Sequence, residues 1–149
     1  KEYLVSHDKR MANTSPGTIE EAIARATMFT ASGLQIRAIA ALTQSGVTAL
    51  LMSRRSSKVP IFALSPNEET RRRVTLFRGV YPVEFGEGLN DPEIILNLAE
   101  EELLQRGVVR NGDIMVMTIG EPVGKSGGTN TMKIIKVGEW KLRQSTDVT

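Results

Sequence analysis

The stretch IRAIAALTQSGVTALLMSRRSSKVPIFAL, residues 36–64, decides the fold. Its first seven residues, 36–42, form an apolar run that is typical of a buried strand, although periodicity alone does not separate such a run from a piece of helix. After a polar turn, apolar side chains return at helical spacing up to Arg55. The residues on this face are Val47, Leu50 and Leu51. Residues 60–64 form a second apolar run, so the stretch reads as strand, helix and strand.

The segments on either side carry helix start signals. Thr18 followed by Glu21 forms a capping box and predicts a helix that ends near Gly33. Residues 65–68 combine an N-cap serine, a proline at the first helical position and a capping-box glutamate, so the sequence predicts a helix that starts from Ser65. The inward positions of that helix are Val74 and Phe77.

The second half of the chain continues the alternation. Residues 80–85 predict a third strand, and residues 90–92, Asn-Asp-Pro, open a helix that ends at Gly107. The apolar positions of this helix are Ile95, Leu96, Ala99 and Leu103. Two further strands are predicted at 114–119 and 131–137, and because no helix separates them, they should pair antiparallel.

Alternating strands and helices over short loops predict an α/β fold in three layers. We expect a five-stranded, mostly parallel sheet with the last strand antiparallel and helices on both faces. Residues 1–17 read as a linker or interdomain arm, residues 18–137 as the domain, and residues 138–149 as a polar tail.

Composition excludes several classes of protein. A chain of 149 residues with 40% hydrophobic content can build one core, and the absence of cysteine excludes disulfides, a cysteine zinc site and a thiol nucleophile. No apolar run is long enough to span a bilayer, so we expect a soluble, cytoplasmic protein without membrane contact. No nucleophile with a base and no placed pair of carboxylates stands out, so no catalytic residue is assigned.

The loop Thr43-Gln44-Ser45-Gly46-Val47-Thr48 joins a predicted strand to a predicted helix. In open α/β sheets, ligands gather beyond the carboxyl ends of the strands, where helix amino termini present free N–H groups. Three hydroxyls, a flexible glycine and these donors describe a cradle for a single phosphate. The alternative is that Thr43 and Ser45 cap the helix.

Residues 120–128 form a second glycine-rich loop that superficially resembles a nucleotide-binding P-loop. Only three residues separate Gly120 from Gly124, whereas a P-loop has four at this point and continues into a helix. We therefore reject a nucleotide triphosphate site here. A flexible flap whose lysine closes over an anion and an ordinary hairpin-like connection both remain open.

Five strings in this order resemble the carboxy-terminal domain of pyruvate kinase over roughly residues 18–137. They are LTQSGVTA (42–49), PIFAL (60–64), LFRGVYP (76–82), NGD (111–113) and TNT (129–131). The resemblance implies the same five-stranded fold and a part of an enzyme that transfers a phosphoryl group from phosphoenolpyruvate to ADP. That reaction would use a barrel that binds magnesium and potassium. Because such a barrel needs about 250 residues, this chain alone is expected to be inactive and to bind no cofactor.

The resemblance also implies an allosteric phosphate site and a share in a tetramer interface. Carried over by position, the phosphate cradle falls on Thr43, Gln44, Ser45 and Thr48, with Gly46 allowing close approach. The flap falls on Lys125, Ser126 and Gly127. The expected partners are a phosphorylated effector, the rest of a pyruvate kinase chain and further copies of it, and not nucleic acid.

The identity of the effector is approached through departures from the family pattern. Animal members that respond to fructose bisphosphate carry a lysine where this chain has Gln44, and a Trp and an Arg where it has Gly88 and Ile95. The sequence of residues 45–52 is closer to that of bacterial members that respond to AMP or sugar monophosphates, so we expect the effector to be a monophosphate.

Two other classes of function stay open at this point. An α/β module could use clustered arginines to bind nucleic acid or another polyanion, in which case binding would fall steeply with salt. The cluster consists of Arg54, Arg55, Lys58, Arg71, Arg72, Arg73 and Arg78. Alternatively, the chain could be an assembly domain whose cradle answers to no phosphate ligand, and Gln44 keeps that alternative open.

Overall fold

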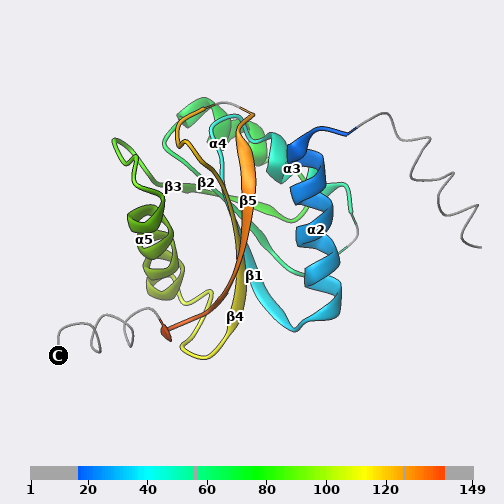
Figure 1. Ribbon diagram of the computed structural model, residues 1–149, viewed down its shortest axis with the longest axis vertical. Coiled ribbons are helices and arrows are strands. Elements are labelled where there is room, and N and C mark those ends of the chain that lie inside the picture. Colours follow the sequence, from blue (N-terminus) through cyan, green and yellow to red (C-terminus); the bar gives the residue numbers. More distant parts are fainter. Residues whose placement is uncertain (1–16, 56, 126, 140–149) are drawn as a thin grey trace, which may run out of the picture.

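The computed structural model describes residues 17–55, 57–125 and 127–139 (Figure 1). The helices are α2 (Ile19–Gly33), α3 (Val47–Ser53), α4 (Glu68–Val74) and α5 (Pro92–Gln105). The strands are β1 (Ile36–Leu42), β2 (Ile61–Ser65), β3 (Val80–Glu84), β4 (Ile114–Gly120) and β5 (Thr129–Lys136). Among these described residues, no helix is both long and apolar enough to cross a membrane.

The five strands form one mixed sheet in the order β3-β2-β1-β4-β5. The pairs β1–β2, β2–β3 and β1–β4 are parallel, and β4–β5 is antiparallel, with Val116 opposite Ile134. The predicted α/β fold with an antiparallel last strand is therefore confirmed. The strand after the glycine-rich loop also confirms that this loop does not continue into a helix, as a P-loop would.

Helices cover both faces of the sheet, as Figure 1 shows for α2 on one side and α5 on the other. One core packs α2, α3 and Val74 of α4 against β1 and β2, around the fully buried Ile39 and Met52. The other core packs α5 against β1 and β4, around Leu103 and Met117. The four apolar positions predicted for α5 are all buried, so its amphipathic pattern was read correctly.

Side-chain caps explain where two of the helices begin. Thr18 Oγ1 accepts a hydrogen bond from the N–H of Glu21 at 3.2 Å, which confirms the predicted start of α2. Asp91 Oδ1 accepts from the N–H of Glu93 at 3.0 Å, and Pro92 takes the first position of α5.

The predicted start of α4 at Ser65 is wrong. Ser65 is the last residue of β2 and pairs with Glu84 of β3, and its hydroxyl accepts from the N–H of Asn67 at 3.2 Å. Asn67 is the N-cap instead, because its Oδ1 accepts from the N–H of Glu69 at 3.1 Å. Sheet pairing therefore delays the helix to Glu68.

The predicted inward face of α3 is also wrong in part. The structure buries Thr48, Ala49 and Met52, whereas Val47 is 38% exposed. The helix has only seven residues, which is too short for a long apolar face. Its orientation follows instead from the packing of Met52 and from the hydrogen bond between Thr48 and Thr129 of β5.

The remaining differences are small or fall outside the described residues. β2 starts one residue later than predicted, and β5 starts at Thr129 rather than Thr131. Strand ends of this kind shift by one or two residues with the pairing of the neighbour. The predicted arm, up to residue 16, and the polar tail from residue 140 lie outside the described residues.

Candidate functional site

A pocket opens at the carboxyl ends of β1, β2 and β4 and encloses about 530 Å³, including its open mouth. Thr43 and Gln44 follow β1, Pro66 follows β2, and the connection between β4 and β5 closes one side. The inner wall is apolar and consists of Leu42, Leu64, Phe85, Leu89, Ile95, Ile119 and Val123. The topology thus places the loop 43–48 and the glycine-rich connection, which are far apart in the sequence, around one cavity.

The hydroxyls of the loop hold the turn before α3. Thr43 is buried, and its Oγ1 accepts a hydrogen bond from the N–H of Gly46 at 2.8 Å. Ser45 Oγ accepts from the N–H of Val47 at 3.3 Å. Both hydroxyls thus stabilise the turn, whereas the N-cap of α3 is Gly46 and has no side-chain cap, so the capping role considered from the sequence is not found.

Gly46 occupies a position that only glycine fits easily. Its φ is 84°, in the left-handed region, and a Cβ there would lie 3.0 Å from Val74 Cγ1 and 3.4 Å from Thr70 Cγ2. Gly46 therefore has a packing role against α4, beside the close approach to a ligand expected from the resemblance.

Two side chains of α4 fix the backbone of the loop, and sequence reasoning missed their role. Thr70 Oγ1 donates to the carbonyl of Gln44 at 2.5 Å, and Arg73 Nη1 donates to the carbonyl of Ser45 at 3.0 Å. Their spacing of three residues, which puts both on one helix face, was the available signal. Arg73 is thus a structural residue of the loop as well as a member of the arginine cluster.

Thr48 does not line the pocket, although its hydrogen-bond partner Thr129 does. It is fully buried, and its Oγ1 donates to Thr129 Oγ1 at 2.9 Å. This bond joins α3 to the first residue of β5 at the base of the glycine-rich connection.

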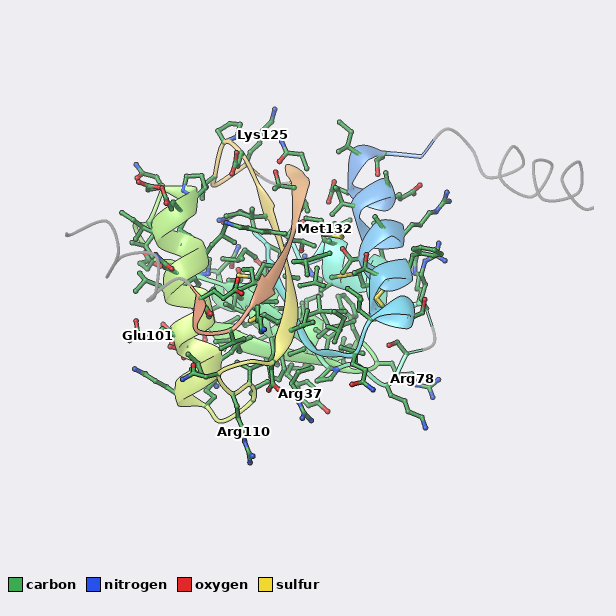
Figure 2. The ribbon with its side chains drawn as sticks, turned by 60° about the horizontal axis from the view of Figure 1, so that its bottom comes forward. Arg37, Arg78, Glu101, Arg110, Lys125 and Met132 are labelled. Carbon is green, nitrogen blue, oxygen red and sulfur yellow. The ribbon has the colours of Figure 1, made fainter. Side chains whose placement is uncertain are left out.

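The connection between β4 and β5 carries the residues that were expected to form a flap, and the structure describes its residues 121–125, 127 and 128. Asn130 holds its base, because Oδ1 accepts from the N–H of Glu121 at 3.0 Å and Nδ2 donates to the carbonyl of Glu121 at 2.7 Å. Lys125 and Gly127 both line the pocket, and Figure 2 shows Lys125 at the tip of the flap. Ser126, which the sequence also assigned to the flap, lies outside the described residues.

The structure brings together four of the predicted site residues around the pocket, and they are Thr43, Gln44, Lys125 and Gly127. Ser45, Gly46 and Thr48 support the loop without lining the cavity. Glu20, from the first turn of α2, also lines the pocket and was not predicted, because nothing in the local sequence places α2 beside the flap.

Few charged side chains line the pocket. Lys125 is the one cation and Glu20 the one anion among the described residues that line it, beside neutral hydroxyl and amide groups. Within the described part of the chain, no group of three or more His, Cys, Asp or Glu is placed to hold a metal ion. A small anion with an uncharged remainder matches this mixture of one lysine, polar loop groups and an apolar wall.

Comparison with known proteins gives a consistent answer. The family model described as pyruvate kinase, alpha/beta domain, matches residues 21–135. The pyruvate kinase of Buchnera aphidicola subsp. Acyrthosiphon pisum is 45% identical over 120 residues, which is 80% of this chain and 25% of that protein. Pyruvate kinase II of Salmonella typhimurium is 40% identical over 120 residues, again 80% and 25%, and the pyruvate kinase of Sporosarcina psychrophila is 36% identical over 127 residues, 85% and 22%. The chain spans about a quarter of the length of these relatives. It belongs to the pyruvate kinase alpha/beta domain family.

Proposed function

We propose that this chain is the regulatory part of a bacterial pyruvate kinase, which binds a phosphorylated small molecule and contributes to a tetramer interface. The observation that carries the first half is the pocket in which Thr43, Gln44 and Lys125 meet. In this proposal the catalytic barrel, with its magnesium and potassium, belongs to the rest of the cytoplasmic enzyme, and this chain transfers no phosphoryl group by itself.

The proposed ligand is a monophosphate such as AMP or a sugar monophosphate. Its phosphate would lie between the loop 43–48 and Lys125, and the flap would close over it. Gly127, with a φ of 72°, gives the flap backbone freedom close to the ligand. An effector of this kind regulates by binding one quaternary state more tightly than another.

The test is a thermal-shift titration of the 149-residue chain with AMP, ribose 5-phosphate, glucose 6-phosphate and fructose 1,6-bisphosphate. We expect a saturable rise in Tm with a monophosphate, since selective binding to the native state stabilises it. Lys125→Gln removes the cation at the flap and should weaken binding about tenfold, because hydrogen bonds to charged groups contribute about 1.5–3 kcal/mol.

Lys58→Gln is the matched control. Lys58 lines a different groove, together with Arg37 and Asp113 at the amino ends of β1 and β4. Its charge therefore lies at the opposite end of the strands from the pocket. Equal losses in both variants would point to a general charge effect. No rise in Tm with any ligand would contradict effector binding and favour an assembly role alone.

The second half of the proposal rests on the outer face of α2. This face carries Ile19, Ala22, Ala26 and Phe29 at helical spacing, and Ile19 and Phe29 are 67% and 81% exposed. β5 beside it is an edge strand, and its Ile134 is 49% exposed. An exposed apolar helix face next to a strand at the edge of the described sheet is typical of an interface between copies of a chain.

Phe29→Glu should raise the dissociation constant of the homo-oligomer at least tenfold, because an aromatic anchor at the centre of an interface is replaced by a charge. Sedimentation velocity over a concentration series measures this. The matched control is Leu76→Glu, since Leu76 is 84% exposed and lies beyond the end of α4. A monomeric wild-type chain at every concentration, or equal effects of the two substitutions, would refute the interface on α2.

A further inference from the structure

The first turn of α2 directs one of its two carboxylates at the flap. Glu20 lines the pocket, and a Cβ on Gly127 would lie 3.1 Å from Glu20 Oε1. The carboxylate therefore lies against the backbone of the flap at Gly127. The amino end of a helix is a favourable place for a negative charge.

The neighbouring Glu21 carries the same charge in another direction. A Cβ on Gly17 would lie 2.6 Å from Glu21 Oε2, so this side chain is folded back toward the start of the helix. Glu21 is not among the residues that line the pocket. Of these two adjacent carboxylates on one helical turn, only that of Glu20 lines the pocket.

A carboxylate at this place restricts what the pocket accepts. A phosphate monoester can place its phosphate at Lys125, the one cation among the described lining residues. A second phosphate would find the apolar inner wall or the Glu20 carboxylate, and repulsion between two like charges in a partly screened site is enough to change binding about tenfold. Hydroxyl groups behave oppositely, because an ionised carboxylate is an acceptor for their hydrogen bonds.

We propose that Glu20 is a specificity-determining residue, which admits a phosphate monoester with an uncharged, hydroxyl-bearing remainder and rejects ligands with a second phosphate. This inference rests on the proposed function of the pocket and deepens it.

The test compares matched ligands that differ by one phosphate. Isothermal titration calorimetry gives the Kd of the 149-residue chain for fructose 6-phosphate and fructose 1,6-bisphosphate, and for AMP and adenosine 3′,5′-bisphosphate. Glu20→Gln keeps the shape of the side chain and removes its charge. In this variant, the ratio of the Kd for a bisphosphate to the Kd for the matching monophosphate should fall about tenfold below its value in the wild-type chain. The effect should shrink in high salt, because the charges lie at the mouth of the pocket.

Glu21→Gln is the control, since it removes the same charge from the same helical turn on a side that does not line the pocket. An unchanged ratio of the two Kd values in Glu20→Gln, or an equal change in Glu21→Gln, would overturn the role of Glu20 and leave the effector site standing. If the wild-type chain binds neither monophosphate, the effector site and the role of Glu20 fall together.

Discussion

Gly46→Ala should lower the free energy of unfolding by about 3 kcal/mol. At a φ of 84°, a residue with a Cβ adopts the left-handed conformation at a cost of about 1–2 kcal/mol. The new methyl group would also lie 3.0 Å from Cγ1 of Val74, which is fully buried and cannot move aside easily. Overpacking of this kind adds about 1–3 kcal/mol. Urea-induced unfolding followed by circular dichroism measures the loss.

Gly79→Ala separates the two contributions to this loss. Gly79 has a φ of 72°, but no heavy atom lies within 4 Å of the Cβ position. The control should therefore lose only the conformational part, about 1 kcal/mol. If both variants lost the same free energy, the contact between Gly46 and α4 would not be the reason that the loop needs glycine.

The strands and long helices could be predicted because their signals are local. The run 36–42 is apolar except for Arg37, as expected for a strand between two covered faces, and Thr18 and Asp91 mark the starts of α2 and α5 with side-chain caps. The sequence around Ser65 failed to give the right boundary because Ser65 and Asn67 are both good N-caps. Pairing with β3 over residues 61–65 decides between them, and that pairing is not visible in the local sequence.

Site residues could be predicted only where the local sequence of a single loop marks them. Thr43 and Gln44 stand out as the end of a buried strand, and Lys125 stands out in a glycine-rich loop. Glu20 has no local mark, because a glutamate in the first turn of a helix is common for reasons of the helix dipole alone. Its place at the pocket depends on how α2 packs across the sheet beside β5, which is a tertiary fact.

Thr48 is the clearest case in which the structure gives a predicted site residue another role. The resemblance assigned its hydroxyl to the phosphate cradle, whereas the structure buries it completely and directs it to Thr129, 81 residues later. A buried hydroxyl needs a partner, so each of these threonines satisfies the other. The pair also ties the end of the flap to α3, next to the loop 43–48.

Thr48→Val should therefore lower the free energy of unfolding by about 2 kcal/mol, because the buried Thr129 hydroxyl loses its partner while the shape of the side chain is kept. Thr129→Val should do the same. The double variant should recover most of the loss, since removing both hydroxyls leaves no unsatisfied group, and the positive coupling in this double-mutant cycle is the signature of the pair. Urea unfolding of the four proteins gives the coupling. Additive losses would show that the two hydroxyls act independently, and a Thr48→Val protein of unchanged stability that no longer binds a monophosphate would return Thr48 to the cradle.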